Sequence, residues 1–167
     1  MDVVFSWFAD AGAWPEHPGS GCAVVDQAVV GPLRLLDHVE TMLGLGRTEV
    51  AAVRRVAIYR RKIEAAGPGR FWSASFTVDS WSAARELLAW RDELVEAGWR
   101  PHVGLARKRL ADIAAAEESG PDLPFGTADR LRAVIDALAE APRASAPLRV
   151  APSNALLREE VQRTQAR

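Results

Sequence analysis

The chain has 167 residues, of which 49% are hydrophobic and 26% are charged, and its formal net charge is −1. This length and balance predict a folded protein with a buried core, and they exclude a disordered chain and a polycation that binds nucleic acid over its whole surface. The single cysteine, Cys22, excludes an internal disulfide bond and indicates a reducing compartment, so we expect a cytoplasmic protein. No segment approaches the ~20 consecutive apolar residues of a membrane span, and the N-terminal segment lacks the basic start of a signal peptide.

The first part of the chain combines strand patterns with a helix. β-Branched and aromatic residues predict a strand over residues 3–8, and apolar residues predict one or two short strands over 22–30. Gly31-Pro32 then opens a helix that runs to the glycines at 44 and 46, because proline is tolerated in a first helical turn.

Three further helices are predicted in the middle of the chain. Thr48 is expected to cap a helix that ends at Gly67-Pro68. The aromatic segment 71–78 is predicted to be extended. Asp79 caps the clearest helix, which ends at Gly98, and Trp81, Ala84, Leu87, Leu88, Leu94 and Val95 form its apolar face. Another helix covers residues 105–119.

The last part of the chain contains two predicted helices and one predicted strand. Thr127 is expected to cap a helix, residues 141–147 form a small-residue linker, and 148–150 form a strand. Asn154 starts a last helix that becomes wholly polar. The fold class is therefore α/β and mostly helical, with about six helices and two to four short strands. We expect a helix-rich domain over residues 1–140, followed by a linker, a short strand and a polar helix over 141–167.

No complete catalytic or metal site is recognisable. The loop after the first strand has glycines and Ser20 but no lysine, so it lacks the P-loop spacing GxxxxGK[ST]. His17, Ser20 and Cys22 lie close together, but a cysteine flanked by Ala23-Val24-Val25 is typical of a buried residue. The three histidines are scattered, and the acidic groups around Asp37 and Asp92 are expected on solvated helix faces. We therefore predict no catalytic residue, no metal ligand and no cofactor.

Basic residues concentrate in the helix predicted after Thr48. Arg54, Arg55, Arg61 and Lys62 belong to this surplus, and they are the candidate phosphate contacts for DNA. The alternative is a solvated helix face whose arginine stems cover apolar neighbours. A second basic cluster runs from Arg100 to Arg109.

Aromatic residues concentrate between Phe71 and Trp99. Exposed tryptophans here would stack on bases, whereas their helical spacing also fits a core or a protein interface. We expect Trp81 to be buried and Trp90 to lie at the flank of the apolar face.

Two blocks resemble a known family. Residues 31–45, GPLRLLDHVETMLGL, and residues 71–99, FWSASFTVDSWSAARELLAWRDELVEAGW, resemble the N-terminal region of large bacterial PD-(D/E)XK nuclease proteins related to the AddB/RecB helicase–nucleases. The family patterns are GPLxLLDxxExxLGL and FWxxSFxVDxWxxAxxLLxWRDxLxxAGW, and the likeness covers roughly residues 3–135. It implies a degenerate helicase-like N-terminal domain whose nuclease domain lies further along a longer protein. No PD-(D/E)XK motif occurs in these 167 residues, so no catalytic residue is carried over.

Three functions follow as hypotheses. The first is a non-catalytic front segment of a DNA-end-processing nuclease, truncated or standing alone, that provides architecture and DNA contact and whose partner is DNA or the missing nuclease domain. The second is a helical protein-interaction module with a tryptophan-rich interface. The third is a small enzyme that uses the loop near Ser20 and Cys22.

Overall fold

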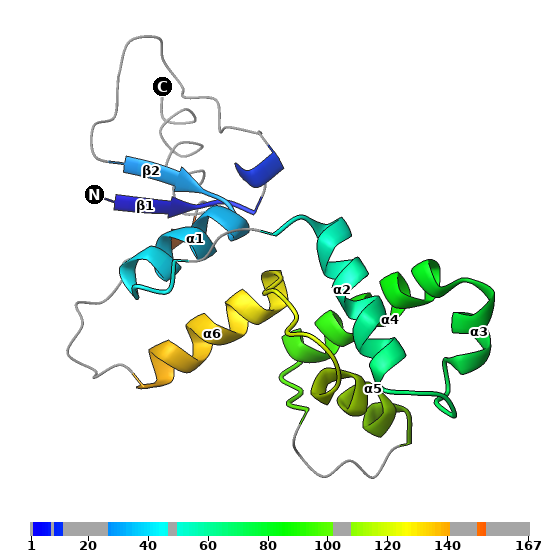
Figure 1. The fold of residues 1–167 in the computed structure, drawn as a ribbon. Helices are drawn as coiled ribbons and strands as arrows, with labels where there is room; N and C mark the ends of the chain where they lie inside the picture. The colour runs from blue at the N-terminus through cyan, green and yellow to red at the C-terminus, as the bar shows by residue number, and fades with distance from the viewer. Residues whose placement is uncertain are drawn as a thin grey trace, which may run out of the picture. The chain divides into compact units, whose positions relative to one another are not determined.

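The computed structural model describes residues 2–7, 9–11, 27–46, 50–101, 108–140 and 150–152, and the chain divides into two units (Figure 1). The first unit comprises Met1–Gly46 and Ala137–Arg167, and the second comprises Arg47–Asp136. The break after Gly46 falls inside the range 1–140 that was expected as one domain.

A small parallel sheet organises the first unit. Strand β1 (Asp2–Phe5) pairs in parallel with β2 (Gln27–Val30) on one side and with β3 (Val150–Pro152) on the other. Phe5 is opposite Val30 and Pro152. Val3 and Val4 point to opposite faces of this central strand, and both are buried, so both faces of β1 are covered.

The first helix follows β2 directly, and a residue from an earlier segment caps it. Asp10 lies in the 3-10 turn η1 (Ala9–Ala11), and its Oδ2 accepts a 2.6 Å hydrogen bond from the Leu33 backbone N–H. Leu33 is in the first turn of α1 (Pro32–Met42). A Cβ on Gly31, the residue before α1, would lie 2.3 Å from the Asp10 Cγ. This position must therefore be glycine for the Asp10 carboxylate to reach the helix.

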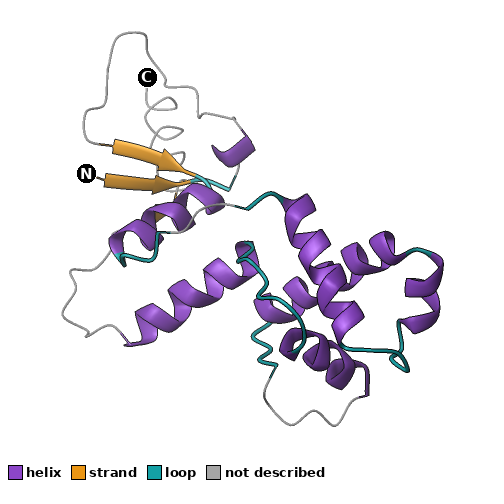
Figure 2. Cartoon of the chain, in the orientation of Figure 1, coloured by secondary structure: helices purple, strands orange, loops and turns teal. Residues whose placement is uncertain are grey.

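The described part of the second unit is helical, and its helices are among the purple segments of Figure 2. They are α2 (Ala52–Ala65), α3 (Ser73–Val78), α4 (Ser80–Glu96), α5 (Lys108–Glu118) and the first part of α6 (Thr127–Glu140). Helices α2 and α4 pack on each other, and α3 packs on α4.

The core of the second unit lies between α2, α4 and α5. Tyr59 is 1% exposed and is its largest fully enclosed side chain. Around it are Val56, Ile63, Trp72, Ala84, Leu87, Leu88, Ile113 and Ala116. Burial of such apolar surface contributes roughly 25 cal/mol per Å² and is the main stabilising term of the unit.

The described residues, with six α-helices and three short strands, confirm the mostly helical α/β fold class. Asp79 caps α4 as predicted, because its Oδ1 accepts 3.0 Å hydrogen bonds from the backbone N–H groups of Trp81 and Ser82. Hydrogen bonds from Ser82 also lower the pKa of Asp79.

Several local predictions need correction. Segment 71–78 is not extended, since residues 73–78 form α3. Ala51, and not Thr48, is the residue that precedes α2, while Thr48 lies outside the described residues. Thr127 was expected to precede and cap α6, but it is the first residue of this helix. At the helix start, the Asp129 carboxylate accepts a 2.9 Å hydrogen bond from the Gly126 N–H. The last predicted helix, from Asn154, also lies outside the described residues.

Candidate functional site

The four candidate phosphate contacts on α2 fall into two pairs. Arg54 and Arg61 are exposed, whereas Arg55 is 8% exposed and Lys62 is 4% exposed. Residues seven apart share a helix face, so each pair lies along one stripe of α2. The prediction that all four present their charges on a surface is therefore wrong for Arg55 and Lys62.

Arg55 is held by groups from two other segments. Its Nη1 and Nη2 form 2.7 and 3.1 Å bonds to the two carboxylate oxygens of Asp92 on α4. Nη2 also donates to Asp129 on α6, at 3.1 Å, and Nε donates to the Pro124 carbonyl, at 2.9 Å. All three of its nitrogens donate to groups inside the protein, and the residue is buried, so this guanidinium is not available to a phosphate on the surface.

A second buried arginine completes this network. Arg91 on α4 is 8% exposed, and its Nη1 contacts Asp92 at 2.9 Å and Asp129 at 2.5 Å. Its Nη2 contacts Glu117 of α5 at 3.2 Å. We call Arg55, Arg91, Asp92, Glu117 and Asp129 the buried ion-pair network, and it joins α2, α4, α5 and α6 of the second unit.

The network was missed in the sequence because Asp92 was expected on a solvated face. Helical spacing carried a usable signal, since Arg91 is four residues after Leu87 and four before Val95 on the predicted apolar face of α4. A charge at such a position is buried, and a buried charge requires partners. Which carboxylates supply them depends on α5 and α6 and could not be read from α4 alone.

Burial shapes the protonation of this region. Burial and, after it, the negative charge of Glu117 raise the pKa of Tyr59 far above its ordinary value. Burial alone would lower the pKa of Arg91, but the carboxylates of Glu117 and Asp129 raise it on balance. Arg91 therefore stays charged, and Tyr59 stays neutral, throughout the physiological range.

Lys62 stabilises the end of a neighbouring helix. Its Nζ donates to the Glu117 carbonyl at 2.8 Å and to the Pro121 carbonyl at 3.2 Å. These carbonyls lie at and beyond the C-terminal end of α5, where helix carbonyls lack internal partners and a positive charge is favourable. Lys62 is therefore a structural cap.

The remaining basic residues of α2 form its solvent-exposed face. The Arg60 Nε lies 3.5 Å from the Glu64 carboxylate, one turn along the same helix, and the two side chains are 41% and 50% exposed. Among the described residues, Arg54 and Arg61 have no ion-pair partner. The exposed pair Arg54 and Arg61 is what remains of the predicted phosphate-binding patch.

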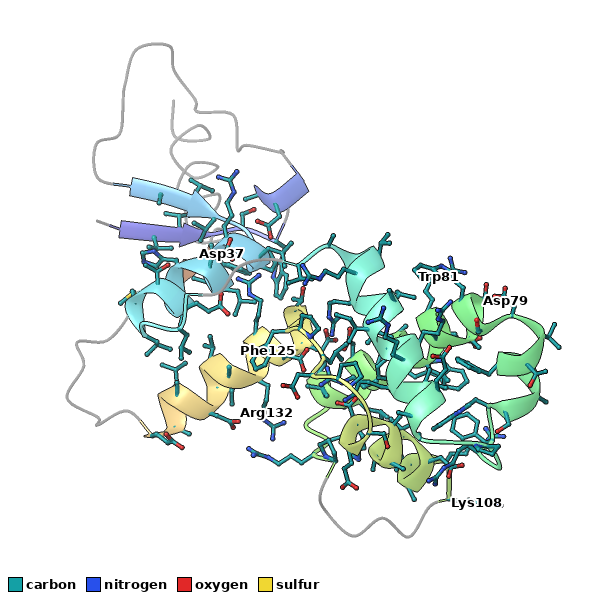
Figure 3. The ribbon with its side chains drawn as sticks, viewed as in Figure 1. Asp37, Asp79, Trp81, Lys108, Phe125 and Arg132 are labelled. Atoms are coloured by element: carbon teal, nitrogen blue, oxygen red, sulfur yellow. The ribbon has the colours of Figure 1, made fainter. Side chains whose placement is uncertain are left out.

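The second basic cluster is also only partly described. Arg100 donates to Asp136 at 2.8 Å. Lys108, labelled in Figure 3, and Arg109 are exposed in the first turn of α5. The Arg109 guanidinium lies 5.6 Å from the centre of the Phe71 ring. Residues 102–107, which include His102 and Arg107, lie outside the described residues.

The tryptophans do not form one surface. Trp72 is buried in the core, whereas Trp81 is 38% exposed and lies with Asp79 at the start of α4 (Figure 3). Because Trp81 is exposed, the prediction that it is buried is wrong. Trp81 and Trp90 are nine residues apart, which places them on opposite sides of α4. Trp90 is also exposed, and its ring stacks on that of Phe71 at a centroid distance of 6.4 Å.

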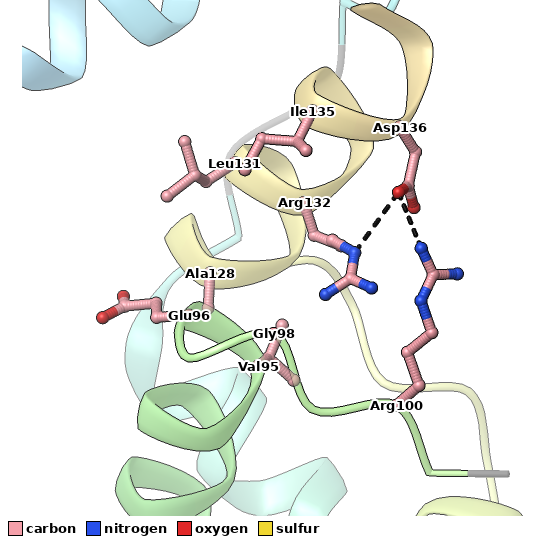
Figure 4. A pocket seen from close by; sticks show the side chains of 9 residues that line it. All are labelled: Val95, Glu96, Gly98, Arg100, Ala128, Leu131, Arg132, Ile135 and Asp136. Atoms are coloured by element: carbon pink, nitrogen blue, oxygen red, sulfur yellow. Dashed lines mark hydrogen bonds and ion pairs between the residues drawn. The ribbon is translucent and has the colours of Figure 1, made fainter. Parts of the chain in front are cut away.

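A groove lies between the C-terminal end of α4 and the side of α6 (Figure 4). Its volume is about 220 Å³. Val95 and Ala128 are its buried apolar residues, and Leu131 and Ile135 line it although they are 40% and 52% exposed. At one end Asp136 accepts from both Arg100 and Arg132.

His17, Ser20 and Cys22, the residues considered for the small-enzyme hypothesis, lie outside the described residues. Within the described ranges, no group of three or more histidine, cysteine or acidic residues is arranged to hold a metal ion. None of the helices there is long and apolar enough to cross a membrane.

Comparisons of the chain with protein-family models, with curated proteins and with solved structures find no match.

Proposed function

We propose that the chain is a non-catalytic, helicase-like N-terminal segment of a DNA-end-processing PD-(D/E)XK nuclease, and that it provides architecture and DNA contact. The two blocks that resemble this family correspond to α1 with the residues that follow it and to α3 with α4. A cytoplasmic location belongs to the same proposal, because the DNA substrate would be there.

The buried ion-pair network supports the architectural role. Arg91 and Asp92 belong to the WRD part of the second block, and they bind residues of α2, α5 and α6. Such a network requires all its partners at once, because a buried charge that loses one partner is strongly unfavourable. The pattern by which the chain resembles the family therefore includes residues that hold the second unit together.

The observation that carries the DNA contact is the exposed pair Arg54 and Arg61 on α2. The rise of an α-helix places them about 10 Å apart along one face. Neither charge is used in an ion pair among the described residues, so both are available to backbone phosphates, as non-specific DNA binding requires.

A binding assay tests this role. The full chain and an Arg54→Ala/Arg61→Ala variant are titrated against a fluorescently labelled DNA duplex at low salt. We expect the variant to bind more weakly, because it lacks two phosphate contacts, and to keep the base preference of the parent, because phosphate contacts carry no sequence information. An Arg34→Ala/Arg85→Ala variant removes the same charge from exposed positions elsewhere and should bind like the parent. Equal affinities of the parent and the α2 variant would refute the contact.

The second candidate is a helical protein-interaction module, favoured by the exposed rings of Trp81 and Trp90. Since these lie on opposite sides of α4, they would serve two contacts and not one tryptophan-rich interface. Absence of DNA binding by the parent chain at low salt would favour this candidate over the first.

A further inference from the structure

The groove between α4 and α6 has the apolar spacing of a helix-packing surface. Ala128, Leu131 and Ile135 follow one another along α6 at intervals of three and four residues. This is the spacing by which one helix packs along another. Leu131 and Ile135 are both exposed, so among the described residues of the second unit this seam is not covered. Natural proteins rarely leave such a row of aliphatic side chains without a partner.

The charged end of the groove determines what kind of partner fits. Arg100 and Arg132 donate to the same oxygen of Asp136, at 2.8 and 3.3 Å (Figure 4). Two positive charges therefore share one carboxylate, and the Arg100 side chain is 58% exposed. Glu96 also lines the groove, but its side chain points away from these arginines (Figure 4). Arg100, Arg132 and Asp136 together thus have a net charge of +1, which a carboxylate of the partner can neutralise.

We propose that this groove binds an amphipathic α-helix of another protein whose apolar face packs on Leu131 and Ile135 and whose flank places a carboxylate at Arg100 and Arg132. Aliphatic anchors at helical spacing select a helix over an extended peptide, because an extended peptide has an alternating period of two. The proposal goes beyond the DNA contact, since no residue of the groove lies on the exposed face of α2.

Two helical peptide probes test the proposal with the full chain. Both are stapled so that they are helical in solution, and both have the same leucine seam. One is flanked by glutamates and the other by lysines. We expect the glutamate-flanked peptide to bind and the lysine-flanked peptide to bind at least about tenfold more weakly, because like charges then meet at Arg100 and Arg132. Equal binding by the two peptides, or no binding by the glutamate-flanked one, overturns the proposal.

Variants locate the binding. Leu131→Asp should weaken binding of the glutamate-flanked peptide at least about tenfold. Val78→Asp should leave this binding unchanged, because Val78 is also an exposed aliphatic residue but lies on α3, away from the groove. Arg100→Ala/Arg132→Ala should remove most of the preference between the two peptides. Thermal unfolding followed by circular dichroism checks that each variant folds.

Measurements on the parent chain keep the test independent of variant stability. Adding the glutamate-flanked peptide should shift the NMR amide signals of Leu131 and Ile135 and leave those of Arg54 and Arg61 in place. Shifts confined to other residues would contradict the assignment.

Self-association that Leu131→Asp abolishes would also overturn the proposal, because the seam would then be covered by a second copy of this chain. DNA binding through α2 should be the same in Leu131→Asp as in the parent, so failure of one proposal is distinguishable from failure of the other.

Discussion

At the scale of single residues, the environment of a charge in the second unit decides its role. Arg54 and Arg55 are neighbours in the sequence, yet one is exposed and the other binds Asp92 and Asp129 in the interior. A one-residue step on a helix turns the side chain by about 100°, which is enough to move it from solvent to core. Counting basic residues along α2 therefore overestimates its phosphate-binding capacity.

Removing Arg91 should destabilise the protein strongly. Arg91→Met would leave Glu117 and Asp129 without their main buried counter-charge, and we expect a loss of about 3–5 kcal/mol in the free energy of unfolding. Urea denaturation followed by circular dichroism measures this loss. Arg54→Ala is the matched control and should change the free energy of unfolding by no more than about 0.5 kcal/mol. A loss below about 1 kcal/mol for Arg91→Met would mean that the network contributes little.

Tyr59 should make the stability fall at high pH. Its pKa is raised in the folded chain, so its stabilising effect is complete below its ordinary pKa of 10.0 and is lost as the pH rises above that value. The unfolded chain then releases the phenol proton and the folded chain keeps it, which favours unfolding by about 1.4 kcal/mol per pH unit. Tyr59 is the single tyrosine of the sequence, so phenolate absorbance reports it alone. Phenolate should form only as the chain unfolds, and Tyr59→Phe should reduce the pH dependence. Ionisation of Tyr59 with the fold intact would contradict the prediction.

At the scale of elements, capping and periodicity predicted most helices, and the errors have physical causes. The Asp79 cap and the helix at Gly31-Pro32 depend on local chemistry, which the sequence contains in full. Segment 71–78 has strand-forming residues, but it packs on α4 as a short helix, so tertiary contacts override its propensity. Trp81 was predicted on the apolar face of α4, but it lies near the start of the helix and is exposed. Periodicity identifies the buried side of a helix, and it does not indicate how far along the helix the partner extends.

The same limit applies to the candidate site. The basic residues were visible in the sequence, but the burial of Arg55 and Lys62 depends on Asp92, Asp129 and the end of α5, which are 37 or more residues away. The groove between α4 and α6 also combines distant segments. Contacts between segments this far apart in the sequence can be identified only from the fold.

The loop before α6 should tolerate no side chain at Gly126. A Cβ there would lie 2.3 Å from the Arg55 guanidinium, which is held by Asp92, Asp129 and Pro124 and cannot move without losing hydrogen bonds. We expect Gly126→Ala to cost about 1–3 kcal/mol, as overpacking does. Gly46→Ala is the control, because nothing lies within 4 Å of its added Cβ. In an Arg55→Ala background most of the Gly126→Ala cost should vanish in a double-mutant cycle, and additive losses would refute the steric explanation.

At the scale of the whole molecule, the two units differ in construction. The described part of the first unit has a parallel sheet followed by α1, and the Asp10 carboxylate already binds the start of this helix at the Leu33 N–H. A helix start is where a nucleotide phosphate would bind, so this position is unfavourable for a second anion. The second unit has a buried ion-pair network and an exposed arginine pair, and the proposed DNA contact belongs to it.

The salt dependence of DNA affinity tests the central claim most directly. Each phosphate neutralised on a duplex adds about −0.9 to the slope of log affinity against log salt concentration. The parent chain and the Arg54→Ala/Arg61→Ala variant are measured at several salt concentrations, with circular dichroism as the folding control. We predict that the variant has a slope flatter by about 1.8, which corresponds to two lost phosphate contacts, and that Arg34→Ala/Arg85→Ala keeps the parent slope. Identical slopes for the folded parent and the folded Arg54→Ala/Arg61→Ala variant would contradict the claim that α2 contacts DNA.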